Sequence, residues 1–404
     1  MTMIYNLNTV NNVQELFNNR SNNTSSINNI LNNLKLIEKA WNKDNKDNKD
    51  VYHIIKYDKQ FINNDTVTTS GLFRSVIHKN GKILVFSPPK AMNEDMFMYR
   101  YHPANCIAEE FIEGTMINLF FDHENQEWEI ASKSAIGAKN NFFVSDNNVN
   151  KTFRTMFLEV CNHVNLNFNR LNKNYCYSFV FQHPDNRIVV PFTNMNLYLC
   201  AAYHINNDNL TVTEISREEL ESLYFTETNV RFPKQFKFTN YYDLKSYYSN
   251  NIDYTHLGII IKENATGMRM KFRNKNYEKV RMLKGNQPKL LYHYITLRNS
   301  DNINDYLKYY PEDKEKFNEY ENKINTFINK LYNYYVSCYI KKHAPLTNYE
   351  FQYKNHMYKI HGIFCEKLRT QNKYVTIEVV KDYCKNLHPS QLMFSLNYHL
   401  RVKN

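Results

Sequence analysis

The sequence Glu-Glu-Phe-Ile-Glu-Gly-Thr, residues 109–115, places carboxylates and a glycine directly in front of an apolar run. That run, residues 115–121, is rich in β-forming side chains and predicts a strand. Glu-Gly-Thr alone is too short and too common to indicate a function. Its meaning therefore depends on the elements that surround it in the chain.

Short strands dominate the region from residue 51 to residue 285. Its β-rich runs are bounded by turn residues, such as Asn80-Gly81 between the second run and the third. The candidate strands are 51–57, 72–78, 82–87, 115–121, 127–132, 175–182, 187–191, 196–204 and 257–262. Residues 151–164 repeat apolar side chains at helical spacing, which predicts a helix among the strands. We therefore expect an α+β domain over 51–285.

The sequence changes character after residue 285. Pro311 is suited to a helix start, and the acidic residues after it are favoured by the helix dipole. An apolar stripe at helical spacing then extends from Phe317 to Cys338, and shorter helical patterns follow at 375–386 and 388–401. These patterns predict a separate all-α C-terminal domain over 286–404.

The first fifty residues are rich in asparagine and carry apolar side chains at helical spacing between Val13 and Ile37. Residues 42–50 repeat Asn-Lys-Asp three times without an apolar residue, which predicts a solvated linker. We expect residues 1–50 to form a helical extension on a loose tether.

Composition narrows the class of protein. A chain of 404 residues with 42% hydrophobic side chains suits a folded protein of two or three domains. The net charge of +11 favours polyanionic partners such as nucleic acid. Lysine is also common in any protein from an AT-rich genome, so charge alone leaves that question open. The chain has no apolar run of membrane-spanning length and no secretory signal, which predicts a soluble, cytoplasmic protein.

The cysteine and histidine residues indicate no metal site. Seven cysteines form no C-x-x-C pair and read as buried thiols in a reducing compartment. His356, His361 and Cys365 match no common zinc spacing and have no evident fourth partner.

An ordered series of short motifs extends from residue 74 to residue 271. The motifs are Arg74–Ile77, Ser87–Lys90, the segment 109–115, Trp128–Ser134, Phe179–Val189, Gly258–Lys262 and Met268–Lys271. Their order resembles the ATP-dependent RNA ligases of the phage tRNA-repair type, within the nucleotidyltransferase superfamily of ligases and capping enzymes. It is most similar to the divergent ligase-like proteins of large DNA viruses. The resemblance covers residues 70–290, and the segment 179–189 is its most specific part.

The resemblance implies an ATP-grasp-like nucleotidyltransferase domain of antiparallel sheets with helices. In such enzymes a lysine attacks the α-phosphorus of ATP, AMP passes to an RNA 5′-phosphate, and an RNA 3′-OH displaces it. The implied cofactors are ATP and Mg²⁺, and the implied partner is RNA, in particular tRNA or its fragments. Because phage-type ligases also append a helical domain, residues 286–404 would confer RNA specificity.

The same resemblance assigns cations to the phosphates. Arg74 would contact ATP or the RNA terminus, and Lys133 would approach the nucleotide from an adjacent strand. Lys262 and Lys271 would bind the α-phosphate and stabilise the transferring phosphoryl group, with Arg269 in support. A solvated lysine at a strand end is the simpler alternative for Lys262 and Lys271.

Three further residues receive roles from the resemblance. Glu113 and Gly114 would shape the loop beside the nucleophile, and Phe179 would stack on the adenine or wall its site. The alternative for Glu113 is a turn carboxylate that caps Thr115.

The chain departs from the family at the reacting positions. Phe111 stands where the nucleophilic lysine belongs, and Val180 and Leu257 stand where carboxylates are usual. Phenylalanine cannot form the lysyl-AMP bond. Lys90 follows two prolines just upstream of the loop, and its side chain could reach the same site from another wall. We therefore take Lys90 as a candidate relocated nucleophile, and an ordinary phosphate-contacting or exposed lysine as its alternative.

Three functions stay open at this point. The first is an RNA ligase-like adenylyltransferase that seals broken RNA. The second is an inactive pseudo-ligase that binds or shields tRNA, for example as an immunity factor against an RNA-cleaving toxin. The third, a capping-type guanylyltransferase, fits the segment 179–189 less well.

Overall fold

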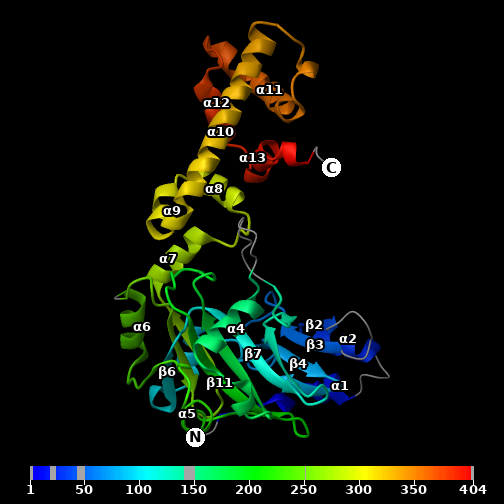
Figure 1. Cartoon of the computed structure of the whole chain (residues 1–404), viewed down its shortest axis with the longest axis vertical. Helices are drawn as coiled ribbons and strands as arrows, with labels where there is room; N and C mark the ends of the chain where they lie inside the picture. The colour runs from blue at the N-terminus through cyan, green and yellow to red at the C-terminus, as the bar shows by residue number, and fades with distance from the viewer. Residues whose placement is uncertain (1–2, 19–23, 43–50, 141–150, 251, 402–404) are drawn as a thin grey trace. The chain divides into compact units, whose positions relative to one another are not determined.

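The computed structural model describes residues 3–18, 24–42, 51–140, 151–250 and 252–401. The chain separates into two compact units, unit 1 (Met1–Lys279) and unit 2 (Val280–Asn404). Figure 1 shows strands throughout unit 1 and helices in unit 2. Within the described residues, no helix combines the length and the apolar character that crossing a membrane requires.

In the described part of unit 1 the strands form three sheets, and all strand pairs are antiparallel. In order across the largest sheet, the strands are β1 (Ile4–Asn6), β12 (Thr211–Glu214), β11 (Asn196–Asn206), β10 (Tyr175–Gln182), β7 (Thr115–Asp122), β8 (Glu127–Ser132) and β9 (Ala135–Ile136). The second sheet consists of β13 (Gln235–Phe236), β6 (Cys106–Glu110), β14 (Gly258–Glu263) and β15 (Arg269–Arg273). The third consists of β2 (Leu36–Asn42), β3 (Val51–Tyr57), β4 (Val76–Lys79) and β5 (Lys82–Val85).

Helices accompany these sheets and build unit 2. Those that begin in unit 1 are α1 (Val13–Asn18), α2 (Thr24–Asn33), α3 (Glu94–Arg100), α4 (Phe153–His163), α5 (Arg217–Leu223), α6 (Tyr241–Asn250) and α7 (Lys275–Lys284). Unit 2 contains α8 (Leu290–Asn299), α9 (Ile303–Tyr309), α10 (Lys314–Tyr335), α11 (Phe351–Ile363), α12 (Ile377–Lys385) and α13 (Pro389–Leu396). The predicted α+β class with antiparallel sheets and a helical C-terminal region is confirmed.

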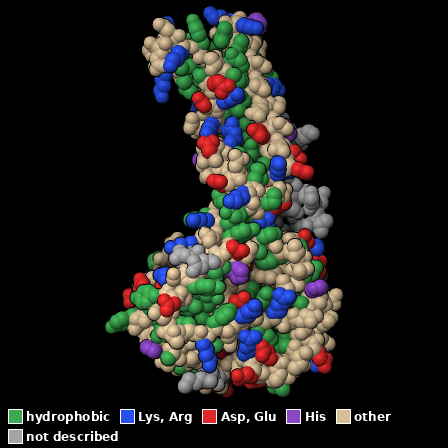
Figure 2. All heavy atoms as spheres, turned by 90° about the vertical axis from the view of Figure 1, so that its left-hand side faces the viewer, with side chains coloured by type: hydrophobic (Ala, Val, Ile, Leu, Met, Phe, Trp, Pro, Cys, Tyr) green, Lys and Arg blue, Asp and Glu red, His purple; other side chains and the backbone are tan. Residues whose placement is uncertain are grey.

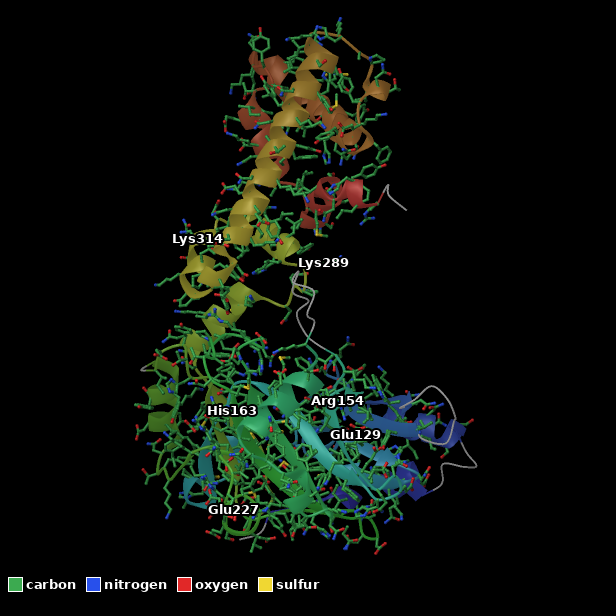
Figure 3. All side chains as sticks on the ribbon, viewed as in Figure 1. Glu129, Arg154, His163, Glu227, Lys289 and Lys314 are labelled. Carbon is green, nitrogen blue, oxygen red and sulfur yellow. The ribbon has the colours of Figure 1, made fainter. Side chains whose placement is uncertain are left out.

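Helix α4 covers one face of the largest sheet. Its Phe157 packs against Phe179 of β10, and both side chains are fully buried. At the edge of this contact Arg154 of α4 donates to the carboxylate of Glu129 in β8, at 2.8 Å (Figure 3). Glu129 is buried, so the bond supplies a partner that a buried carboxylate requires.

The N-terminal residues differ from the expected helical extension. Strand β1 pairs with β12 and β2 pairs with β3, so this region contributes to two of the sheets. Leu7 and Leu16 are fully buried in the core beneath the third sheet. Residues 3–18 and 24–42 are therefore an integral part of unit 1. The rest of the predicted Asn-Lys-Asp linker, residues 43–50, lies outside the described residues.

One predicted strand is absent from the described residues. Residues 187–191 form no strand and instead a loop whose Val189 and Val190 amides donate to Glu113. Conversely, the short strands β6, β12, β13 and β15 were not among the sequence candidates. They are two to five residues long, a length at which alternation gives little signal.

Candidate functional site

The loop 111–114 carries the chain from β6 in the second sheet to β7 in the largest sheet. The buried carboxylate of Glu113 accepts hydrogen bonds from the Val189 and Val190 amides, at 2.8 and 3.1 Å. Glu113 therefore fastens the 187–190 loop to this crossing. Its expected role beside a nucleophile stays a prediction.

Lys271 of β15 extends to this loop. Its Nζ atom lies 4.1 Å from the centroid of the Phe111 ring, and the Arg273 guanidinium lies 5.9 Å from the same centroid. Burial, together with the repulsion of neighbouring positive charges, lowers the pKa of Lys271 to about 5. Those neighbours are Arg269, Arg74, Arg273 and Lys90.

Three more cations share this environment. Burial lowers the pKa of Arg74 to about 10 and that of Lys133 to about 8. It also lowers the pKa of Lys90. Repulsion contributes in each case, because Arg269 acts on Arg74 and on Lys90, and Arg74 acts on Lys133. We call Arg74, Lys90, Lys133 and Lys271 the cationic cluster.

The cationic cluster has no acidic counterpart. In the described part of the chain, none of its four side chains forms an ion pair with Asp or Glu, and none of the main groups that shift their pKa values is a carboxylate. Figure 2 shows Lys and Arg side chains among Asp and Glu over the visible surface. The cluster thus differs from the ordinary surface by its burial and its uncompensated charge.

Arg269 donates hydrogen bonds to backbone carbonyls. Its Nε and Nη2 atoms donate to the carbonyls of Pro89 and Pro88, at 2.8 and 2.9 Å, and its side chain is buried. Arg269 therefore holds the segment that carries Lys90. The Lys90 ammonium in turn donates to the Ala91 carbonyl, at 3.0 Å. These contacts give Arg269 a positioning role, and its expected support of the phosphates stays a prediction.

Lys262 belongs to a different, compensated group. Its Nζ atom lies 2.8 Å from a Glu109 carboxylate oxygen and 3.2 Å from one of Glu214. Burial opposes the charged form, but the two carboxylates hold the pKa of Lys262 well above its usual range. In this arrangement the Lys262 charge is already neutralised, which does not suit the expected contact with the α-phosphate. Neither acid was singled out from the sequence as a partner of Lys262.

Phe179 lies in the core and not beside a ligand. Its ring is fully buried between Phe157 of α4 and Phe225, with ring centroids 6.0 and 6.3 Å away. Val180, the next residue of β10, faces the opposite side toward Gly114. The expectation that Phe179 walls the adenine is therefore wrong for this chain.

The cluster fits a polyphosphate better than it fits a divalent metal. Four half-buried cations suit phosphate oxygens. A divalent ion such as Mg²⁺ requires oxygen ligands, usually including carboxylates. Three acids of this region, Glu109, Glu113 and Glu214, are already engaged by Lys262 or by backbone amides.

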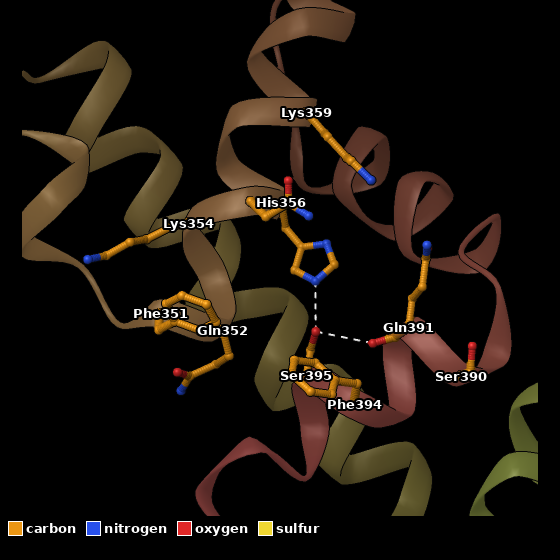
Figure 4. A pocket seen from close by; sticks show the side chains of 10 residues that line it. Phe351, Gln352, Lys354, His356, Lys359, Ser390, Gln391, Phe394 and Ser395 are labelled. Carbon is orange, nitrogen blue, oxygen red and sulfur yellow. Dashed lines mark hydrogen bonds between the residues drawn. The ribbon is translucent and has the colours of Figure 1, made fainter. Parts of the chain in front are cut away.

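Unit 2 contains a cavity of about 490 Å³ between α11 and α13 (Figure 4). Its lining combines the aromatic rings of Phe351 and Phe394 with the cations Lys354 and Lys359. His356 also lines it, but both ring nitrogens are hydrogen bonded, one to Tyr383 and one to Ser395, each at 2.8 Å. Burial lowers the pKa of His356 to about 4, so this ring is neutral near pH 7.

Comparison with known proteins gives weak similarity to ligases, and no known family profile matches the chain. The RNA ligase of Rhodothermus phage RM378 is 30% identical over 118 residues, which are 28% of this chain and 26% of that protein. The chain thus matches about a quarter of this relative's length. An archaeal ATP-dependent RNA ligase aligns over 73% of this chain and 70% of its own, with 11% identity and a TM-score of 0.38. A lysine-to-alanine variant of the Naegleria gruberi RNA ligase with ATP and Mn aligns over 44% and 51%, with 9% identity and a TM-score of 0.29.

Proposed function

We propose that unit 1 is a ligase-like nucleotidyltransferase domain that binds the phosphates of ATP with the cationic cluster. The observation that carries this proposal is the uncompensated charge of four half-buried cations, one of which, Lys271, lies against Phe111 of the 111–114 loop. Burying like charges together is unfavourable unless a counter-ion joins them. A triphosphate supplies that counter-ion, and it would raise the depressed pKa values toward their usual range.

RNA is the proposed acceptor. The sequence similarity to a phage RNA ligase supports this choice over DNA. The net charge of +11 agrees with a polyanionic partner, since cations on a protein release counterions from the nucleic-acid backbone. The finer assignments, Mg²⁺ as the metal and tRNA as the RNA, belong to this proposal as well.

Lys271 is the lysine best placed to replace the missing nucleophile. With a pKa near 5 its amine is neutral at pH 7, and it lies against the ring of Phe111, the residue at the usual nucleophile position. In the proposed step the Nζ lone pair attacks the α-phosphorus. An N–P bond forms, the bond to the β-phosphate oxygen breaks, pyrophosphate leaves, and the amine releases a proton to water. Lys90 is the second candidate, because its pKa is lowered as well.

Covalent labelling tests this proposal. The full chain is incubated with ATP radiolabelled at the α-phosphate and a divalent metal, and then run on a denaturing gel. We expect a labelled band that is lost in Lys271→Ala and kept in Lys82→Ala, a matched exposed lysine on β5. Loss in Lys90→Ala instead would assign the attack to Lys90. Labelling that survives both variants would refute Lys271 and Lys90 as the nucleophile.

A second function is favoured by Phe111 itself. A ring at the nucleophile position, together with the neutralised charge of Lys262, suits a protein that kept a basic site and lost the covalent step. Such a pseudo-ligase would bind or shield tRNA, for example against an RNA-cleaving toxin. No labelled band with ATP or GTP, combined with tight and salt-sensitive binding of tRNA, would select this function. A band with GTP alone would select guanylyl transfer.

We propose that the cavity of unit 2 contributes to RNA binding. Phe351 is exposed and stacks on Tyr398, and Lys354 and Lys359 line the same cavity. Aromatic faces with nearby cations suit an unpaired base and its phosphate. Lys354→Ala combined with Lys359→Ala should weaken RNA binding and reduce its salt dependence, whereas Lys314→Ala, in α10, should leave both unchanged.

A further inference from the structure

Three potential metal ligands meet on the third sheet of unit 1. They are Glu38 of β2, His53 of β3 and His78 of β4, and one ligand atom of each lies within 4.8 Å of the others. They come from three adjacent strands, and His53 is the register partner of His78. No member of this group belongs to the cationic cluster or to the Lys262 network.

The two distances from Glu38 to the histidines match the edges of a tetrahedral site. The Nδ1 atom of His53 and the Nε2 atom of His78 lie 3.5 and 3.2 Å from the same Glu38 oxygen. Bonds of about 2.0–2.1 Å from zinc to nitrogen and oxygen, at tetrahedral angles, place neighbouring ligand atoms roughly 3.3–3.5 Å apart. The measured separations therefore leave room for one ion among the three atoms.

The surroundings of Glu38, His53 and His78 favour a bound metal ion over hydrogen bonds alone. His78 is fully buried, and the Phe17 ring packs edge-on against it, with centroids 5.4 Å apart. His53 Nδ1 is buried and makes no hydrogen bond within the described residues, although it is aimed at Glu38. The side chain of His53 is 26% exposed, so solvent can supply a fourth ligand. The two imidazole rings are stacked at 10°, so each must tilt about its Cβ–Cγ bond to point its lone pair at the ion.

We propose that Glu38, His53 and His78 form a Zn²⁺ site that ties together β2, β3 and β4. Two imidazoles and a carboxylate suit zinc among the common divalent ions, and three protein ligands leave one position for water. The site is a property of the third sheet and goes beyond the proposed nucleotidyl transfer. Its zinc stabilises the N-terminal part of unit 1 by adding a side-chain cross-link to three hydrogen-bonded strands.

Zinc titration of the full chain tests the site. The protein is treated with EDTA, dialysed and titrated with Zn²⁺ alone in a calorimeter. We expect binding of one equivalent, weakened at least about tenfold in His53→Ala and in the nearly isosteric Glu38→Gln, since even the loss of an outer partner of a metal ligand has that effect. His163→Ala removes an exposed histidine at the end of α4 (Figure 3) and should bind zinc like the unmodified chain.

Thermal melting separates ligand loss from misfolding. In EDTA, Glu38→Gln should show the circular dichroism of the unmodified chain, and added Zn²⁺ should raise the melting temperature of the unmodified chain and of His163→Ala only. If His53→Ala does not fold, the zinc binding of Glu38→Gln alone tests the site. The site is refuted if the unmodified chain binds less than one equivalent, or if Glu38→Gln binds zinc as tightly as the unmodified chain does.

Discussion

The ammonium nitrogen of Lys271 lies 4.1 Å from the centre of the Phe111 ring. The ring face attracts a cation, which favours the charged form of Lys271. Burial and the surrounding cations oppose that form more strongly, and the pKa falls to about 5. At the position expected for a nucleophile, this chain therefore has an aromatic ring and, next to it, a lysine from β15 that is neutral near pH 7.

Replacing Lys271 with methionine should stabilise the protein when no phosphate is present. Between pH 5 and about 10.5, the usual lysine pKa, the unfolded chain binds more protons at this position than the folded chain does. Lys271 therefore lowers the free energy of unfolding by its full amount below pH 5, and this loss becomes smaller as the pH rises from 5 to about 10.5. In phosphate-free buffer at pH 7, calorimetry should show a higher melting temperature for Lys271→Met, and the difference should shrink toward pH 10.

ATP should reverse the order of the melting temperatures of Lys271→Met and the unmodified chain. A triphosphate that binds the cationic cluster stabilises the unmodified chain by mass action, and the variant gains less because one contact is missing. A Lys271→Met protein that melts lower than the unmodified chain at pH 7, or that gains as much from ATP, would contradict this account.

Phe111→Lys should place an amine at the position expected for the nucleophile. The new cation joins an uncompensated cluster, so the melting temperature without ATP should fall. Its pKa should also be depressed, which favours attack on a bound triphosphate. Mass spectrometry after incubation with ATP should locate AMP on residue 111. Phe61→Lys, at a half-exposed ring elsewhere in unit 1, is the control and should acquire no AMP.

Lys262→Met should destabilise unit 1 strongly, in contrast to Lys271→Met. It leaves Glu109 and Glu214 buried without their cation, and breaking a buried pair in this way costs about 3–5 kcal/mol. Urea denaturation should show the loss, and Glu109→Gln in the same chain should recover part of it. If Lys262→Met and the double variant with Glu109→Gln unfold at the same urea concentration, the buried carboxylates do not need Lys262 for their stability.

Periodicity predicted the elements that are long enough to show it. The apolar stripe from Phe317 onward corresponds to α10, and the alternation of 175–182 corresponds to β10. The short strand β1, in an asparagine-rich stretch, has too few residues for alternation to be visible. The N-terminal segment was therefore predicted as helical only, although its strands complete two sheets.

The site was predicted in part for a similar reason. Ordered motifs indicated Arg74, Lys133 and Lys271, and the structure places these cations in one electrostatic environment. Alternation along β10 shows that Phe179 and Val180 face opposite sides, but it does not show which side meets α4. The pairing of Lys262 with Glu109 depends on the alignment of β14 with β6, and a single sequence does not reveal that register.

Gly114→Ala should distort the crossing between β6 and β7. Gly114 has φ near +144°, a conformation that only glycine adopts readily, and an added Cβ would lie 2.4 Å from the Phe181 carbonyl oxygen. We expect a loss of about 1–3 kcal/mol, measured by urea denaturation, because backbone strain and a clash with immobile main chain act together. Gly362→Ala is the matched control, since a Cβ there meets no atom within 4 Å. Gly362→Ala lies in α11 and should be neutral or stabilise the protein by up to about 1 kcal/mol. Equal losses of stability in Gly114→Ala and Gly362→Ala would show that the close approach at Gly114 is not what requires glycine.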